Sequence, residues 1–135
     1  MNLWLLAAST LIASILVAIL FHCFHQRLRQ QLTPTRESVI AVENAYSSNR
    51  QTIRFATAHG LTLEGWWFTT TYEQKGHALL THGWGSNRTT LQPLVPVLLA
   101  AGWNVLIFDV RNHGNSDKDT FSSMPRFAED IESVK

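Results

Sequence analysis

Four stretches of the chain are almost entirely apolar, and their lengths predict different elements. Residues 3–21 carry no charged side chain. As an α-helix they would extend roughly 28 Å, close to the thickness of the hydrocarbon core of a bilayer. Residues 77–81 and 103–108 have the length of buried β-strands, and residues 91–101 between them have the length of a helix. The pattern therefore predicts an N-terminal membrane helix followed by a strand–helix–strand unit.

The strand–helix–strand unit predicts an α/β fold. Two strands joined through a helix lie parallel in one sheet, whose faces are covered by helices. Residues 51–68 precede the unit and alternate in polarity around His59 and Gly60, which predicts a β-hairpin because glycine accepts a positive φ. Residues 122–135 predict a final helix that begins at a serine cap. Its expected apolar stripe is Phe127, Ile131 and Val134, with Glu129, Asp130 and Glu132 outside.

The helix between the two strands is expected to begin near Pro93, where a missing N–H costs little. Its apolar residues fall on every side, which is typical of a helix buried against a sheet. Gly102 suits the position just after the last helical turn.

The chain is expected to have three parts. Residues 1–25 form a transmembrane signal anchor that crosses the bilayer through residues 3–21, residues 26–50 form a juxtamembrane connector, and residues 51–135 form the α/β domain. A cleaved signal peptide is disfavoured because no basic side chain precedes the apolar stretch and no small-x-small cleavage site ends it. A buried core helix is disfavoured because histidines and arginines follow the stretch at once.

Charge and composition restrict the function further. Arg27, Arg29 and Arg36 follow the apolar stretch, so the positive-inside bias predicts a single-pass membrane protein whose C-terminal domain lies in the cytoplasm. The formal net charge of +1 argues against a nucleic-acid-binding surface. A single cysteine excludes a disulfide within the chain. His22 and His25 could share a helix face, but no further metal ligand lies near them, and neither a metal nor another cofactor is expected.

The residues with catalytic character follow the two predicted strands. His82-Gly83-Trp84-Gly85 comes directly after the first strand, and residues 109–116, Asp-Val-Arg-Asn-His-Gly-Asn-Ser, come after the second. Ligands of parallel sheets bind beyond the carboxyl ends of the strands, where both loops are expected. Together the two motifs resemble the oxyanion loop of the α/β-hydrolases and the D-x-R-G-x-G-x-S loop after the next strand in that family. The resemblance covers roughly residues 51–135, with asparagine at position 112 where glycine is commoner.

The resemblance implies the N-terminal part of an α/β-hydrolase fold, with a leading β-hairpin and then a βαβ unit, preceded by one transmembrane helix. It implies that the backbone N–H of Trp84 is one donor of the oxyanion hole, with Gly83 and Gly85 letting the loop approach a substrate carbonyl. The family activity is hydrolysis of an ester, thioester or amide in a small acyl-type substrate, by a serine nucleophile without a cofactor. The other motif residues are expected to be structural: His82 and His113 bonded to backbone, Asp109 and Arg111 as a charged pair bracing the loop, and Gly114 and Ser116 as further structural residues of the motif.

The family's nucleophile is absent from the sequence. It lies in G-x-S-x-G on a strand-to-helix turn, and the nearest approach, residues 114–118, has Lys118 in place of the second glycine. The acid and the histidine follow the nucleophile in the family, so by the resemblance all three would come after Lys135. The chain is therefore expected to be a hydrolase by family but inactive alone, because triad members act as a unit.

Two other functions remain open from the sequence. Gly83 and Gly85 after one strand and Asp109 at the end of the next fit a nucleotide-binding, Rossmann-like domain, although Arg88 replaces the third glycine of G-x-G-x-x-G. A non-enzymatic, membrane-tethered remnant of a hydrolase would account for the missing triad. Binding of NAD would distinguish the first alternative, and reactivity toward a serine-directed probe would distinguish the second.

Overall fold

The computed structural model describes residues 2–41 and 46–135, and it divides the chain into two compact units that meet between Leu32 and Thr33. The first unit is one helix, α1 (Leu3–Gln31), which includes the predicted span and the beginning of the predicted connector. Among the described residues it is the one helix long and apolar enough to cross a membrane, with a mean hydropathy of 2.5 over its most apolar window. Length and composition fit a membrane span and a signal sequence equally.

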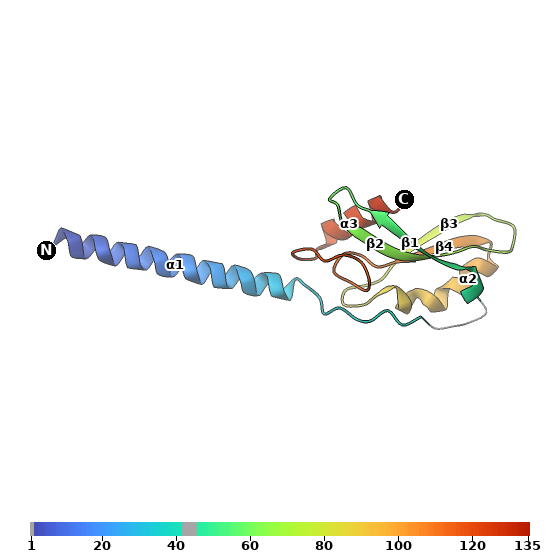
Figure 1. Cartoon of the computed structure of the whole chain (residues 1–135), viewed down its shortest axis with the longest axis horizontal. Helices are drawn as coiled ribbons and strands as arrows, with labels where there is room; N and C mark the ends of the chain where they lie inside the picture. The colour runs from blue at the N-terminus through green and yellow to red at the C-terminus, as the bar shows by residue number, and fades with distance from the viewer. Residues whose placement is uncertain (1, 42–45) are drawn as a thin grey trace. The chain divides into compact units, whose positions relative to one another are not determined.

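The second unit is built on one sheet with the strand order β1-β2-β4-β3 (Figure 1). β1 is antiparallel to β2, β2 is antiparallel to β4, and β3 and β4 are parallel. The predicted hairpin and the predicted βαβ unit are therefore confirmed. A turn of 3-10 helix, η1 (Ser47–Asn49), leads into β1. The strand bounds are β1 (Arg50–Ala56), β2 (Thr62–Phe68), β3 (Gly76–Thr81) and β4 (Trp103–Phe108).

The connection from β3 to β4 begins as a 3-10 helix, η2 (Arg88–Leu94), and continues as α2 (Val95–Ala100). It ends as predicted, with Gly102 at a φ of 89° and its N–H donating to the carbonyl of Leu99. The expectation of burial on every side is wrong. Leu99 is buried, but Val97 is two-thirds exposed, because the helix rests on the sheet with one face only.

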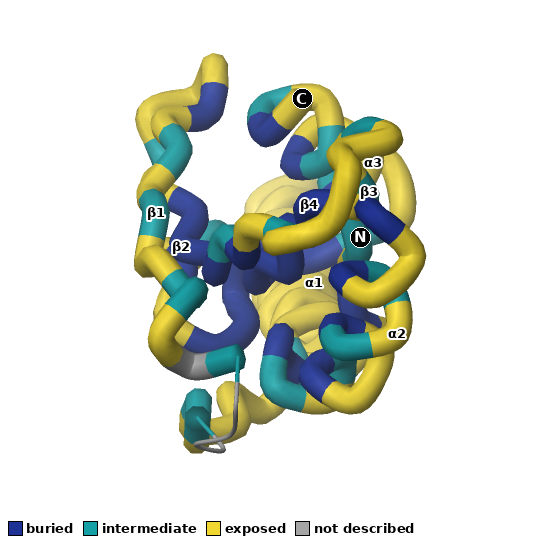
Figure 2. Tube along the Cα trace, turned by 90° about the vertical axis from the view of Figure 1, so that its right-hand side faces the viewer, coloured by how far each residue is buried: buried dark blue, intermediate teal, exposed yellow. Residues whose placement is uncertain are grey.

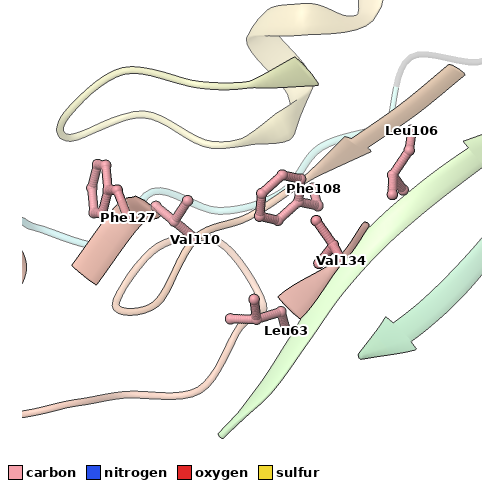
Figure 3. Packing of buried hydrophobic residues seen from close by; sticks show 6 residues of the cluster. All are labelled: Leu63, Leu106, Phe108, Val110, Phe127 and Val134. Atoms are coloured by element: carbon pink, nitrogen blue, oxygen red, sulfur yellow. The ribbon is translucent and has the colours of Figure 1, made fainter. Parts of the chain in front are cut away.

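The two faces of the sheet carry separate apolar cores. One cluster lies under α2 and joins β2 and β4 through Trp66, Phe68, Val95, Leu99, Val105 and Ile107. The other lies under α3 (Met124–Ser133) and consists of Leu63, Leu106, Phe108, Val110, Phe127 and Val134 (Figure 3). β4 contributes to both clusters and is buried along most of its length, as the dark tube in Figure 2 shows.

The final helix, α3, confirms one part of its prediction and corrects another. Ser123 caps it by accepting from the N–H of Arg126, and the predicted stripe of Phe127, Ile131 and Val134 packs against the sheet. Asp130 was expected outside, but it is fully buried. It lies one position before Ile131 on the inward side of the helix, where a buried arginine of the second motif loop binds it.

Within the described part of the chain, β3 has β4 as its one neighbour and forms an edge of the sheet. Its apolar side chains, Leu79 and Leu80 among them, are only half-buried. A cavity of about 300 Å³ opens beside it, between Trp67, Leu106 and Val134. The sheet thus leaves apolar surface and backbone hydrogen-bonding groups uncovered along this strand.

Candidate functional site

The two motif loops leave the sheet side by side. Thr81 of β3 pairs with Phe108 of β4, so the parallel strands end at the same level and His82 and Asp109 follow at the same edge. The rings of His82 and His113 lie 4.9 Å apart between the loops. Both predicted loops therefore meet at one place beyond the carboxyl ends of the strands.

His82 and His113 join the two loops by reciprocal hydrogen bonds. Nε2 of His113 accepts from the N–H of Gly85 at 3.2 Å, and Nε2 of His82 accepts from the N–H of Val110 at 3.4 Å. Nδ1 of each ring lies 2.8 Å from a carbonyl oxygen, that of Gly83 or of Arg111. Both rings therefore act as neutral Nδ1–H tautomers, with Nε2 free to accept.

Burial enforces the neutral state of both rings. It lowers the pKa of His82 and of His113 below the ordinary value, although the bonds to carbonyl oxygens and the charge of Asp109 oppose this. The neighbouring His82 lowers the pKa of His113 further. Because each ring uses both nitrogens on backbone groups, neither is available as a general base in this arrangement.

Trp84 stands at the tip of the first loop, and its side chain is half-exposed rather than buried. Its ring stacks on Phe127 of α3 and meets the edge of His113, each with 6.0 Å between centroids. The peptide groups on either side are engaged: the carbonyl of Gly83 accepts from Ser86, and the N–H of Gly85 donates to His113. The N–H of Trp84 donates to no group in the described chain.

Asp109 and Arg111 do not pair with each other, which corrects the expectation of one charged pair. The partner of Asp109 is Arg88, whose backbone N–H and Nη1 donate to its two carboxylate oxygens at 2.7 and 2.5 Å. Nη2 of Arg88 donates to Glu64 at 2.7 Å, and its guanidinium lies 4.5 Å from the ring of Trp66. Arg88 is 1% exposed, so this ion-pair network is buried under the first loop.

Glu64 is the second acid of that network. Burial alone raises the pKa of Glu64, but hydrogen bonds from Asn115, Arg88 and Arg54 outweigh it and hold the pKa below the ordinary value. Glu64 therefore stays charged beside Arg88. Nothing in the motif resemblance pointed to Arg88 or Glu64. The one available signal was a charged residue, Glu64, in an otherwise apolar strand.

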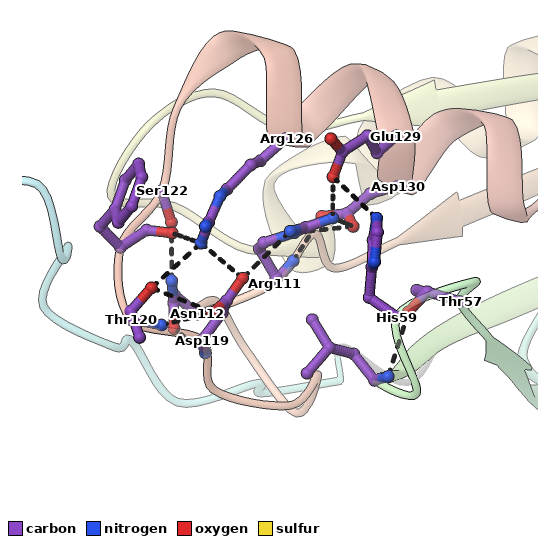
Figure 4. Close-up of polar contacts among 12 residues, drawn as sticks. Thr57, His59, Arg111, Asn112, Asp119, Thr120, Ser122, Arg126, Glu129 and Asp130 are labelled. Atoms are coloured by element: carbon purple, nitrogen blue, oxygen red, sulfur yellow. Dashed lines mark hydrogen bonds and ion pairs between the residues drawn. The ribbon is translucent and has the colours of Figure 1, made fainter.

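Arg111 binds three acids, Asp119 in the loop before α3 and Glu129 and Asp130 on α3 itself (Figure 4). Its Nε and Nη2 donate to Asp130 at 2.9 and 2.8 Å, and Nη1 donates to Asp119 at 3.0 Å. Nη2 also reaches Glu129, which faces the exposed His59 of the hairpin turn. Arg111 thus ties the second loop to the final helix, and burial of its charge is offset by these partners, which raise its pKa.

The backbone conformation of the second loop accounts for the asparagine and the glycine in its sequence. Asn112 adopts a φ of 66°, the left-handed conformation that asparagine tolerates better than most residues and glycine best of all. Gly114 also has a positive φ, and a Cβ there would collide with the carboxylate of Asp109. Ser116 closes the turn, donating from Oγ to the carbonyl of Asp109 and accepting from the N–H of Glu64. Gly114 and Ser116 therefore have structural roles in this turn.

The described residues can be compared with what a metal ion or a nucleotide would need at these loops. Among the described residues, no group of three His, Cys, Asp or Glu side chains could hold a metal ion. Asp109, the acid that a nucleotide-binding domain would offer to a ribose, is fully buried, and its oxygens accept from Arg88 and Asn115. The site is therefore a pair of braced glycine loops at the ligand-binding end of an α/β sheet.

Comparison with known proteins identifies this architecture. No protein-family model and no curated protein matches the chain. Among solved structures, the esterase Pf2001 of Pyrococcus furiosus is 26% identical with a TM-score of 0.63, and the match covers 76% of this chain and 38% of the esterase. The α/β-hydrolase GrgF of a Penicillium species is 24% identical with a TM-score of 0.55, covering 63% and 30%. The esterase EaEST of Exiguobacterium antarcticum is 22% identical with a TM-score of 0.53, covering 62% and 30%.

The second unit therefore has a partial α/β-hydrolase fold, as the motif resemblance implied. The chain spans well under half the length of each of these proteins.

Proposed function

We propose that this chain is the membrane-anchored N-terminal part of an α/β-hydrolase, in which the loop at residues 82–85 supplies one donor of the oxyanion hole. The observation that supports this most is the backbone N–H of Trp84. It has no acceptor among the described residues, while the peptide groups beside it are held by hydrogen bonds. A donor fixed before the reaction stabilises the charge that develops on a substrate carbonyl without further reorganisation.

The substrate in this proposal is a small ester, thioester or amide. Attack on its carbonyl carbon converts the carbonyl oxygen to an oxyanion, which would accept from the N–H of Trp84. The half-exposed Trp84 ring, stacked on Phe127, offers apolar surface beside that position. α1 would hold the protein in the membrane through residues 3–21, with the C-terminal unit in the cytoplasm.

The serines of the motif loops are unsuited to the role of nucleophile. Oγ of Ser116 is buried between the carbonyl of Asp109 and the N–H of Glu64. Oγ of Ser86 donates to Thr90. Neither hydroxyl contacts a base, and an unactivated serine is a weak nucleophile at neutral pH. We therefore expect the chain alone to hydrolyse nothing by a serine mechanism.

A chimera tests the proposal directly. The part of the Pyrococcus furiosus esterase that follows the matched region is joined after Lys135, and the folded product is assayed with a fluorophosphonate probe and a p-nitrophenyl ester. We expect labelling and turnover. Trp84→Pro, which removes the N–H, should lower kcat by about 10²–10³-fold. Trp84→Ala keeps the N–H and is the matched control, expected to change kcat only a few-fold.

Two results would contradict the proposal. A folded chimera that is labelled by the probe but loses the same activity in Trp84→Ala and Trp84→Pro would show that the side chain matters, not the N–H. Stoichiometric labelling of Ser86 or Ser116 in the unmodified chain would reveal a nucleophile in the part expected to be inactive.

A further inference from the structure

Residues 33–41, here called the strap, contact both motif loops. The strap follows α1 in the sequence and runs without regular secondary structure past the loops (Figure 1). Nη2 of Arg36 donates to the carbonyl of Ser116 at 2.5 Å. Nδ2 of Asn87 donates to the carbonyls of Glu37 and Ser38 at 3.3 and 3.1 Å. A segment expected to be a passive connector is therefore bonded to the end of each loop.

The strap is also held by apolar packing. Val39 and Ala41 pack against the cluster under α2 that includes Trp66 and Leu99. Thr33, at the other end, donates from its hydroxyl to the carbonyl of Thr120 at 3.4 Å, beyond the second motif loop. The strap is thus attached at both ends and at two points between them.

The two central contacts of the strap, with Ser116 and with Asn87, lie where the two motif loops end. Ser116 closes the second loop, and its N–H donates to the carbonyl of His113. Asn87 follows the first loop and caps η2, with its Oδ1 accepting from the N–H of Thr89 at 2.9 Å. Asn87 is 1% exposed with the strap in place, so its amide donates to the strap carbonyls rather than to solvent. Without the strap, the carbonyl of Ser116 and the side-chain amide of Asn87 would lose these hydrogen-bond partners.

We propose that the strap positions the two motif loops, and that Arg36 and Asn87 are the positioning residues through which it acts. By holding the carbonyl of Ser116 and the side-chain amide of Asn87, the strap fixes the position of His113 relative to the Trp84 peptide group. The strap would restrict the motion of the two loops whether or not they belong to a working hydrolase. It makes the membrane-proximal segment part of the candidate site.

The test uses the full chain in nonionic detergent and measures amide hydrogen exchange by mass spectrometry. Arg36→Gln removes the strap's bond to Ser116. Asn87→Ser removes the amide donors but retains a side chain that caps helices well. We expect exchange in residues 82–87 and 109–120 to rise about tenfold or more in both variants, because loops open locally when their ties are lost. Exchange in β1 and β2 should not change.

Two controls separate this effect from general destabilisation. Thr89→Val removes a hydroxyl that donates to Asn87 but leaves the strap contacts, and Arg54→Gln removes an exposed arginine far from the strap in sequence. Both should leave exchange in the two loops unchanged. Because Arg36 is itself exposed, its variant should fold even if Asn87→Ser does not.

A spectroscopic measurement gives a second, local readout. The ¹⁵N shifts of the His113 ring report the bond from the N–H of Gly85 to Nε2 and the tautomer. Arg36→Gln should shift these signals, while those of the exposed His59 stay in place. The proposal is overturned if loop exchange and the His113 signals match the unmodified chain, or if exchange rises equally in β1 and β2.

Discussion

Loss of Arg88 should strongly destabilise the second unit. Its guanidinium is 1% exposed and lies between two carboxylates, those of Asp109 and Glu64, both of which are at least nine-tenths buried. Arg88→Met would keep most of the side-chain volume and remove the charge. The buried carboxylates of Asp109 and Glu64 would then repel each other, because the cation between them is gone.

The cost can be bounded from the structure. Removing one partner of a buried ion pair costs about 3–5 kcal/mol, because the remaining charge is buried and uncompensated. Arg54→Met supplies a matched control, since Arg54 binds the same Glu64 at 3.1 Å but is 72% exposed. An exposed pair is worth about 0–1 kcal/mol. Domains are stable by about 5–15 kcal/mol, so Arg88→Met should remove a large share of the total.

The assay is urea unfolding of the full chain in detergent, followed by tryptophan fluorescence. The midpoint should fall strongly for Arg88→Met and barely for Arg54→Met. Adding Asp109→Asn to Arg88→Met should restore part of the loss, because it removes the charge of Asp109, whose cation was Arg88. Equal effects of the two methionine variants would refute the claim that burial makes the Arg88 network the stronger one.

Two further predictions concern the N-terminal helix α1 and a glycine of the second motif loop. The chain should stay with membranes through high-salt and alkaline washes. The double variant Ile15→Lys, Leu16→Lys should be released, since each charge costs about 3 kcal/mol at the centre of a membrane helix. Recovery of the unmodified chain in the wash, or a mature N-terminus beyond Phe21, would contradict a membrane anchor. Gly114→Ala should cost at least about 2 kcal/mol in the same unfolding assay, because its Cβ would meet the Asp109 carboxylate. Gly60→Ala, also at a positive φ but with open space around it, should cost only about 1 kcal/mol.

The sequence was sufficient to locate the motif loops but not to identify what braces them. Strand and helix periods predicted the hairpin and the βαβ unit, and these placed His82 and Asp109 at one edge of the sheet. The partner of Asp109 is set by tertiary distance, and in the sequence Arg88 stands out only because it replaces the third glycine of G-x-G-x-x-G. Ion pairs between residues far apart in sequence leave no periodic signal, so such partners could not be read from the chain.

Asp130 is different, because a local signal for it existed. Phe127, Asp130 and Val134 have the spacing i, i+3, i+7, which places all three on one face of a helix. Its charge led to the prediction of an outward position. A carboxylate on the buried face of a helix requires a cation nearby, and Arg111 in the preceding loop is that cation.

The His82–His113 pair predicts that the second unit loses stability as the pH falls from neutral. Burial lowers the pKa of both rings below 6.5, the ordinary value that the unfolded chain retains. Below about pH 6.5 the unfolded state therefore binds more protons than the folded state, which favours unfolding. Stability should be fully present above the unfolded pKa and should decline as the pH falls toward the folded pKa of each ring.

The geometry predicts where the loss begins. Protonation of Nε2 removes the acceptor for the N–H of Gly85 in one ring and for that of Val110 in the other, so the two motif loops separate. Unfolding midpoints measured between pH 8 and pH 5.5 should fall for the unmodified chain and equally for His59→Asn, whose ring is exposed. His113→Gln should reduce the slope of midpoint against pH, because one of the two titrating rings is gone. A slope unchanged in His113→Gln would show that this ring does not carry the pH dependence, and that the neutral tautomer does not hold the loops together.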